Sequence, residues 1–298
     1  MPTVTIDGHS VEVERGATVL DAARYAGIWI PTLCYHPALS SEASCRLCMV
    51  ELDRGDRRYL VTACNYPVRQ DIVVYVMSER AQQARRGVME LLLARSPDSE
   101  ELKELAERMG VKGTRWPKVT ESQRNCILCG LCVRVCEQII GKSAIGFAGR
   151  GADRTVAAPF RQPSQDCIGC GACAAVCPVG TIEVRVHQDE REVEISPFKS
   201  RVKLLVCKQC GAPILSTQVC EQALRNVGWA TCLPMQARSQ GNVRMGRKSA
   251  HPTFWPDLRK RLRLCPKCRK LQTVEGLGAA KVRIQETGVR SQETGDSG

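Results

Sequence analysis

The sequence predicts an α+β protein built from several small domains, and three observations support this prediction. The chain has 298 residues, more than one compact core usually organises. Strand patterns dominate residues 1–78, whereas helical patterns dominate residues 79–110. Aromatic residues make up only 4% of the chain, while its 18 cysteines occur in tight groups. We therefore expect bound metal, as well as apolar burial, to hold the fold together.

Residues 1–78 are expected to form a small mixed sheet with one helix packed across it. Alternating residues flank the turn-forming pair Asp7-Gly8, which predicts a hairpin. Thr18 is placed to cap a helix with Asp21 three positions later, and Gly27 is placed to close it. Further strands are predicted at 49–52, 59–61 and 72–76.

Residues 79–118 are predicted to form a short helical domain. The apolar residues Val88 and Leu91 to Leu93 lie in one helical segment, Ser96-Pro97 breaks it, and a second helix ends at Gly110. This stretch contains no cysteine. A linker at Trp116-Pro117 leads out of it.

Residues 119–190 contain two similar cysteine runs, 126–136 and 167–177, each with the spacing C-x2-C-x2-C-x3-C. This spacing is typical of ferredoxins with two [4Fe–4S] clusters, in which the last cysteine of each run serves the other cluster. The segment 143–156 between them is a candidate hairpin. The expected ligand sets are Cys126, Cys129, Cys132 and Cys177 for the first cluster, and Cys167, Cys170, Cys173 and Cys136 for the second.

Zinc is the alternative metal for these runs, but a tetrahedral zinc site uses four ligands in two pairs. Each run instead has three equally spaced cysteines followed by a fourth, and this pattern occurs twice. That is more than a zinc site requires. Gly130, Gly169 and Gly171 lie between the expected ligands, where a missing Cβ would let the backbone approach a cluster. The alternative interpretation is that they are ordinary turn glycines.

Four earlier cysteines, Cys34, Cys45, Cys48 and Cys64, follow the predicted N-terminal helix. Their number and place indicate a [2Fe–2S] site, with zinc as the alternative. The first gap, C-x10-C, is longer than the C-x4-C gap of plant-type ferredoxins, so this loop differs from theirs.

Two features of the sequence indicate a reducing, cytoplasmic location. The cysteines are grouped in tight C-x2-C units rather than spread singly, and the N-terminus lacks a basic stretch followed by an apolar run, so a secreted disulfide framework is not expected. No apolar run approaches the roughly 18 residues of a membrane span. Any membrane attachment is therefore expected to come through a partner.

Residues 196–275 form a basic region with two further cysteine pairs, Cys207/Cys210 and Cys265/Cys268. These pairs could hold one zinc ion as in a zinc ribbon, or a rubredoxin-like iron. Cys220 or Cys232 could replace one of the four. Residues 276–298 are predicted to be disordered.

The formal charge of +12 comes entirely from residues 201–298, which hold 18 Lys and Arg against 6 Asp and Glu. Basic residues beside a metal knuckle could neutralise phosphates. Aromatic residues for base stacking are scarce near them, apart from Phe254 and Trp255. A protein-docking or solvated face is the favoured interpretation, and no nucleic acid is expected.

Longer strings resemble a known family. The strings IPTLCYHP, SCRLCMVEL and NCILCGLCVRVCEQIIG are similar to the large iron–sulfur subunit of respiratory complex I. They are also similar to the diaphorase subunits of NAD-reducing hydrogenases and to related formate dehydrogenase subunits. The resemblance covers roughly residues 1–190 and implies a ferredoxin-like β-grasp [2Fe–2S] domain ahead of a double-[4Fe–4S] domain.

In much of that family a helix ending in His-Pro precedes a cluster held by one histidine and three cysteines. Here Ser96 stands in place of the histidine, and no cysteine occurs between Cys64 and Cys126. The resemblance therefore implies that this cluster is missing while its helical scaffold is kept. His36, next to Cys34, is expected to be a structural or potential-tuning neighbour.

No glycine-rich dinucleotide motif follows a predicted strand, and no nucleophile–base pair stands out. We therefore expect a non-catalytic electron-transfer subunit of a multisubunit oxidoreductase. Its expected partners are a flavoprotein that oxidises NAD(P)H and a catalytic redox module, namely a hydrogenase, a formate dehydrogenase, a quinone module or a low-potential reductase. The alternative hypothesis is a redox-sensing regulator that binds nucleic acid through the basic metal knuckle.

Overall fold

The computed structural model describes residues 1–119, 125–187, 189–216, 218 and 219. Among these, 1–204 and 215–219 belong to one compact unit, and 205–214 belong to a second. The predicted tail 276–298 lies outside the described residues. No helix in the described ranges is both long and apolar enough to cross a membrane.

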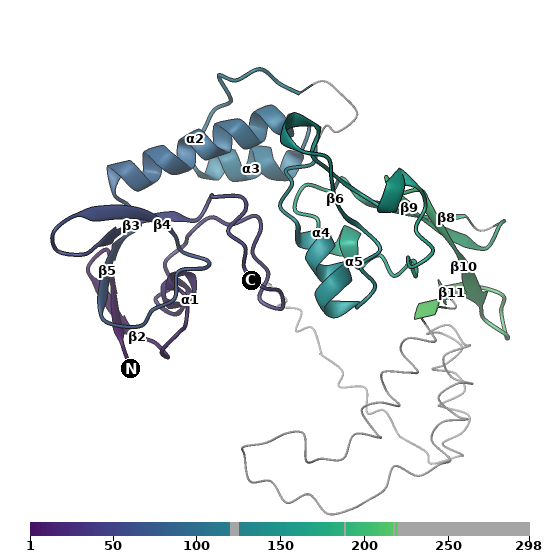
Figure 1. The fold of residues 1–298 in the computed structure, drawn as a ribbon, viewed down its shortest axis with the longest axis horizontal. Coiled ribbons are helices and arrows are strands. Elements are labelled where there is room, and N and C mark those ends of the chain that lie inside the picture. The colour runs from purple at the N-terminus through teal and green to yellow at the C-terminus, as the bar shows by residue number, and fades with distance from the viewer. Residues whose placement is uncertain (120–124, 188, 217, 220–298) are drawn as a thin grey trace, which may run out of the picture. The chain divides into compact units, whose positions relative to one another are not determined.

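The first sheet has five strands in the order β2-β1-β5-β3-β4 (Figure 1). Strands β1 and β2 pair antiparallel around Asp7 and Gly8, which both have positive φ, so the predicted hairpin is confirmed. Strand β5 runs parallel to β1 and antiparallel to β3. The bounds are Thr3–Ile6 for β1, His9–Glu12 for β2, Met49–Asp53 for β3, Arg58–Thr62 for β4 and Ile72–Tyr75 for β5.

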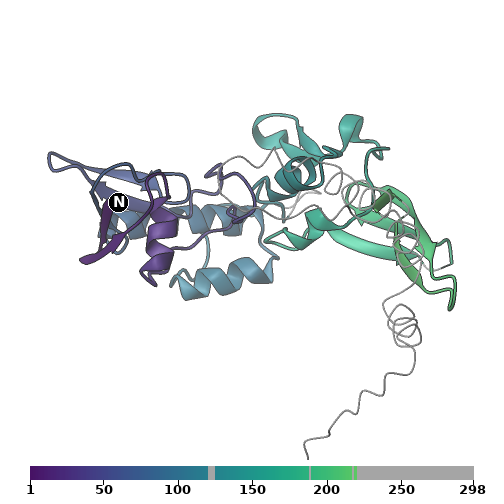
Figure 2. The ribbon, with the colours of Figure 1, turned by 90° about the horizontal axis from the view of Figure 1, so that it is seen from below.

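Helix α1 (Val19–Tyr25) packs against this sheet and is drawn in purple beside it in Figure 2. Thr18 and Asp21 form the predicted capping box, in which each side chain accepts a hydrogen bond from the other's backbone amide. Gly27 ends the helix with a φ of 70°. Both helix boundaries therefore follow the sequence prediction.

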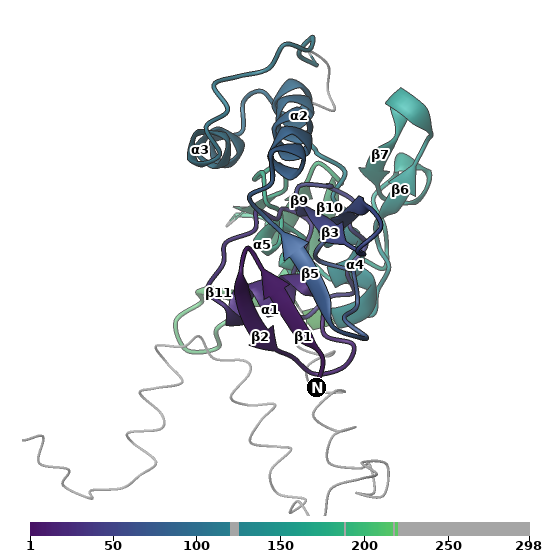
Figure 3. The ribbon, with the colours of Figure 1, turned by 90° about the vertical axis from the view of Figure 1, so that its left-hand side faces the viewer.

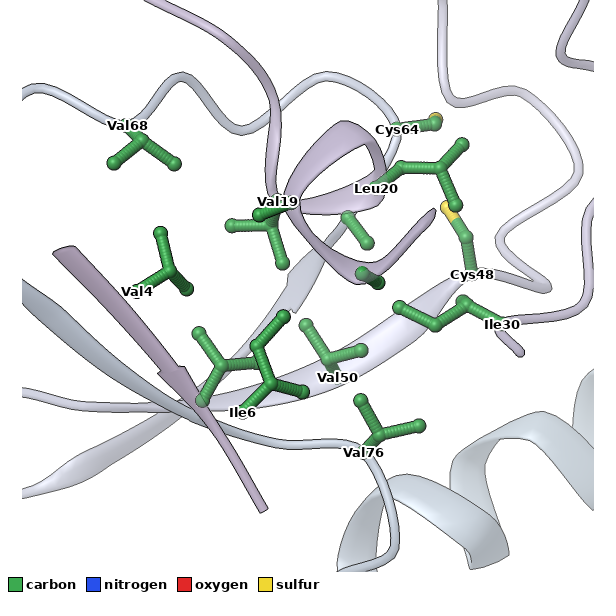
Figure 4. Packing of buried hydrophobic residues seen from close by; sticks show 14 of the residues in the cluster. Val4, Ile6, Val19, Leu20, Ile30, Cys48, Val50, Cys64, Val68 and Val76 are labelled. Carbon is green, nitrogen blue, oxygen red and sulfur yellow. The ribbon is translucent and has the colours of Figure 1, made fainter. Parts of the chain in front are cut away.

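The core of this sheet domain is aliphatic. Val19 and Leu20 of α1 point into the same core as Val4 and Val50 of the sheet (Figure 4). Each such burial contributes about 1.5–3 kcal/mol. Cys48 lies at the margin of this core beside Leu20, so the packing of the sheet domain also fixes a candidate ligand.

Helices α2 (Glu79–Arg95) and α3 (Glu100–Arg108) lie side by side and are separated at Ser96-Pro97, as predicted (Figures 1 and 3). Ser78 and Ser99 cap their N-termini. The buried Arg85 fastens α2 to the sheet, because its guanidinium donates to the carbonyls of Met49 (3.0 Å) and Val76 (2.7 Å).

The two cysteine runs each contain one short helix, α4 (Leu131–Arg134) and α5 (Ala172–Ala175), and these helices contact each other. A π-helical turn, Val135–Ile139, extends α4. Between the runs, β6 (Gly146–Ala148) and β7 (Thr155–Ala157) form the hairpin expected around residues 143–156.

A second sheet in the order β11-β10-β9-β8 follows the second run. Val193, Ile195 and Val202 of this sheet are buried with Phe198 in one cluster that also includes Cys132. Strands of this sheet lie on both sides of the domain boundary that was expected between residues 190 and 196. Its strands are β8 (Glu183–His187), β9 (Glu192–Ser196), β10 (Ser200–Val206) and β11 (Pro213–Ser216).

Candidate metal centres

The four N-terminal cysteines come together at one end of the β3–β4 hairpin. The register pairs Met49 with Thr62, and the carbonyl of Cys48 accepts a hydrogen bond from the amide of Ala63 at 3.0 Å. This pairing brings Cys48 and Cys64 to the same edge of the sheet. Cys34 and Cys45 arrive on the preceding loop, where the amide of Cys45 donates to the Cys34 sulfur at 3.4 Å.

All four of these thiols are buried and linked through hydrogen bonds. The hydrogen bond to Cys34, together with burial, raises the pKa of the Cys45 thiol. The hydrogen bond with Cys64 lowers the pKa of the Cys48 thiol. Four converging sulfurs, one of which accepts a backbone amide, are a donor set suited to a thiolate-ligated iron–sulfur centre.

The first run borders a cavity of about 140 Å³. Three of its cysteines line this cavity together with Cys177, which lies at the end of the second run. Ile182 and Phe198 contribute an apolar wall. The cysteines in the lining are Cys126, Cys129, Cys132 and Cys177.

The second run borders a smaller cavity of about 30 Å³. Like the first cavity, it is lined by three cysteines of one run and one cysteine of the other. Cys136 reaches it from the end of the first run, and its sulfur accepts a hydrogen bond from the amide of Ala144 at 3.4 Å. Ile145 and Ile195 line it from other parts of the chain. The cysteines in the lining are Cys136, Cys167, Cys170 and Cys173.

Burial sets the ionisation of these thiols. It raises the pKa of Cys129 to about 12 and that of Cys173 to about 12. The amide of Leu131 opposes this effect at Cys129 by hydrogen bonding to the sulfur. Thiols in such surroundings lose their protons when a metal compensates the charge, as metal ligation requires. Four sulfurs per cavity, with amide donors and apolar walls, therefore fit [4Fe–4S] groups.

The glycines between the expected ligands serve the turns that hold the cysteines. Gly130 and Gly171 adopt φ of 74° and 72° immediately before α4 and α5. At Gly169, with φ of 66°, a Cβ would lie 2.6 Å from a methyl group of Val193. Only glycine therefore fits both the backbone and the packing at position 169.

Ser96, which the resemblance aligns with a histidine ligand, makes a structural contact. Ser96 is fully buried and donates its hydroxyl to the carbonyl of Asn125 at 3.0 Å. The neighbouring Arg95 donates from Nε to the carbonyl of Cys126 at 2.9 Å. The end of α2 thus holds the first candidate ligand of the first run. His36, near Cys34, accepts a hydrogen bond from the amide of Ala38 at 3.2 Å.

The first cysteine pair of the basic region forms a tight knuckle between β10 and β11. The amide of Cys207 donates to the carbonyl of Ala212 at 2.8 Å, and the amide of Gly211 donates to that of Cys207 at 2.9 Å. Cys207 is buried and Cys210 is exposed. The other cysteines of this region lie outside the described residues: Cys220, Cys232, Cys265 and Cys268.

In the described part of the chain, no three or more His, Cys, Asp or Glu side chains are arranged to hold a single metal ion. Iron–sulfur clusters are larger than a single metal ion. Their fit to these sites is inferred from the number of thiols, the two cavities and the amide donors.

Two arginines whose guanidinium groups bind carbonyls of candidate ligands, Arg95 and Arg134, were not predicted from the sequence. The signal for Arg134 was present, because it is a charged residue inside the apolar string Leu131 to Val135. A charge at such a position is seldom buried without polar partners. The carbonyls that accept its hydrogen bonds could not be read from the sequence.

Comparison with known proteins identifies three domain families. Residues 1–79 match the family described as a 2Fe-2S iron-sulfur cluster binding domain. Residues 116–183 match the ferredoxin-like domain of NADH-quinone oxidoreductase subunit 3, and residues 166–223 match a 4Fe-4S dicluster domain. The prediction of both [2Fe–2S] and [4Fe–4S] ferredoxin-type domains is therefore confirmed.

Two curated relatives are subunits of oxidoreductases. The mitochondrial NADH-ubiquinone oxidoreductase 78 kDa subunit of Candida albicans is 32% identical over 203 residues, which are 60% of this chain and 28% of that protein. The NADPH-Fe(3+) oxidoreductase subunit alpha of Geobacter sulfurreducens is 34% identical over 205 residues, covering 61% and 24% respectively. The chain thus spans about a quarter of the length of these relatives.

Among solved structures, a chain from the crystal structure of an NAD+-reducing [NiFe]-hydrogenase in the H2-reduced state is similar. It is 27% identical, the match covers 70% of this chain and 88% of that chain, and the TM-score is 0.48.

Proposed function

We propose that this chain, an iron–sulfur protein of the NADH dehydrogenase and NAD-reducing hydrogenase type, relays single electrons between a flavoprotein and a catalytic redox subunit. The relatives named above are subunits of NADH- and NADPH-linked oxidoreductases, which supports this assignment. The flavoprotein would oxidise NAD(P)H. The catalytic subunit would be a hydrogenase, a formate dehydrogenase, a quinone module or a low-potential reductase.

The observation that carries the proposal is the crossed composition of the two cavities. Each is lined by three cysteines of one run and one cysteine of the other. Two sites of four thiols each are what a pair of [4Fe–4S] groups requires. When bound, such clusters gain and lose one electron at a time at thiolate-ligated iron. The proposed ligands are Cys126, Cys129, Cys132 and Cys177 for one, and Cys136, Cys167, Cys170 and Cys173 for the other.

The N-terminal domain would add a [2Fe–2S] cluster held by Cys34, Cys45, Cys48 and Cys64. The protein's own contribution is to bury these sulfurs, to direct the Cys45 amide at one of them, and to exclude water with the aliphatic core around Cys48. Burial and amide hydrogen bonds are the features by which proteins set cluster potentials.

The chain contains no glycine-rich dinucleotide motif. Hydride transfer would therefore belong to the flavoprotein, and substrate chemistry to the catalytic partner. We place the complex in the cytoplasm, with any membrane contact made by a partner subunit.

For the basic region we propose one zinc ion bound by Cys207, Cys210, Cys265 and Cys268. The C-x2-C spacing of Cys207 and Cys210, with a tight turn in which the amide of Gly211 bonds back to the Cys207 carbonyl, suits one half of a tetrahedral zinc site. Elemental analysis tests this proposal, because a rubredoxin-like site would contain iron and no zinc.

Anaerobic purification from the native host tests the electron-relay function. The full chain should contain about ten irons, two for the [2Fe–2S] and eight for two [4Fe–4S] clusters, and up to one zinc. A flavoprotein and a redox enzyme should copurify with it. An iron content near two, or a sequence-specific shift of nucleic acid at physiological salt, would contradict the proposal.

A further inference from the structure

Arg134 is a buried charge at the junction between two candidate centres. It is the last residue of α4, between Cys132 and Cys136, and its side chain is only 3% exposed. The side chain of arginine is cationic, so this position places a positive charge inside the protein.

The guanidinium reaches carbonyls of two ligand loops that are far apart in sequence. Nη2 donates to the carbonyl of Cys34 at 2.8 Å and to the carbonyl of Cys129 at 3.2 Å. Cys34 is a proposed ligand of the [2Fe–2S] cluster, and Cys129 is a proposed ligand of the first [4Fe–4S] cluster. Nη1 donates to the carbonyl of Ser40, on the loop that follows Cys34.

A second, uncharged contact joins the same two segments at the surface. Gln138 accepts a hydrogen bond from the Ser40 amide at 3.0 Å and donates to the Ser40 hydroxyl at 2.6 Å. Gln138 is exposed, whereas Arg134 is buried. Gln138 therefore provides a neutral contact with which the charged contact of Arg134 can be compared.

The charge of Arg134 is incompletely balanced by protein groups. Among the described residues, the carboxylate that pairs with it belongs to Glu42, whose Oε2 lies 3.7 Å from Nε and whose side chain is 47% exposed. Nε itself is buried without a hydrogen-bond partner. Such a charge is costly in a protein interior unless opposite charge lies nearby. Thiolate-ligated clusters on both sides would provide it.

We propose that Arg134 is a positioning residue that fixes the [2Fe–2S] loop against the first [4Fe–4S] loop and raises the reduction potentials of both centres. The inference rests on the proposed function, because it requires both clusters to be bound. Reduction adds a negative charge, and a fixed positive charge close to both ligand loops favours the reduced forms. The fork geometry of the guanidinium lets one side chain hold both loops at once.

The test compares variants of the full-length, cluster-loaded protein by redox titration followed with electron paramagnetic resonance. Arg134→Gln should lower both potentials, with the reduction equilibrium weakened at least about tenfold, or about 59 mV for one electron. Arg134→Lys should largely keep the potentials but weaken the magnetic interaction between the two reduced centres. Gln138→Ala should leave both potentials unchanged.

Glu42→Gln provides an independent check on an exposed residue, where folding is at little risk. Removing this carboxylate should shift both potentials upward, opposite to Arg134→Gln. A purely structural contact would not produce shifts of opposite sign. If both substitutions leave both potentials unchanged at full iron content, the inference is wrong. If the unmodified protein lacks either cluster signal, the proposed function itself fails.

Discussion

Cys136 and Cys177 are exchanged between the two cavities. Each is the last cysteine of its own run, yet Cys136 lines the cavity of the second run and Cys177 lines that of the first. This exchange follows from the contact of α4 with α5. The two candidate [4Fe–4S] sites therefore form as one folded body.

Substitution of these two cysteines should remove different clusters. Cys177→Ala should abolish the signal of the cluster proposed for Cys126, Cys129 and Cys132, and Cys136→Ala should abolish the other. Paramagnetic resonance of the reduced protein, with iron analysis, measures both effects. The opposite pattern, in which each substitution affects the cluster of its own run, would show that the ligand assignment is wrong.

Gly169→Ala should destabilise the second candidate site. The new Cβ would lie 2.6 Å from Val193 in a backbone with φ of 66°. The left-handed conformation costs about 1–2 kcal/mol and the overpacking a further 1–3 kcal/mol. Gly151→Ala is the matched control, because Gly151 also has a positive φ but open space around its Cβ position.

The measurement is the urea midpoint of cluster loss from the second site under anaerobic conditions. Gly169→Ala should lower it clearly more than Gly151→Ala. Equal effects of the two substitutions would mean that contact with Val193 does not constrain the turn.

Ser96→Ala should destabilise the link between α2 and the first cysteine run. It would remove the 3.0 Å hydrogen bond that the fully buried Ser96 hydroxyl donates to the carbonyl of the partly buried Asn125, at a cost of about 0.5–1.5 kcal/mol. Denaturant unfolding of the loaded protein measures this cost. Ser10→Ala, in an exposed strand position, should change stability by no more than about 0.5 kcal/mol. If the two substitutions have similar effects, Ser96 does not support the run.

Removal of zinc should leave the iron–sulfur centres intact. Cys207 and Cys210 belong to the second compact unit, whereas the twelve proposed iron ligands belong to the first. Treatment with a zinc chelator should therefore release zinc without changing the visible absorption of the clusters. Parallel loss of iron and zinc would indicate that the two units share a metal site.

Local sequence patterns predicted the parts of the fold that depend on a few neighbouring residues. The hairpin at Asp7-Gly8, the capping box of Thr18 and Asp21, and the helix break at Ser96-Pro97 are all as expected. Each depends on backbone preferences within one or two turns of chain. The second sheet was not predicted, although β9 and β10 pack beside the second run.

The sequence by itself determined the kinds of cluster-binding domain, because cysteine spacing reports directly on how many sulfurs a short loop can bring together. Only the tertiary structure decided what surrounds them. Arg134 reaches Cys34, 100 residues earlier in the chain, and Ser96 reaches Asn125, 29 residues later. Such contacts depend on how separate elements pack, and hydrogen bonds to backbone carbonyls leave no residue-specific pattern in the sequence at the accepting position.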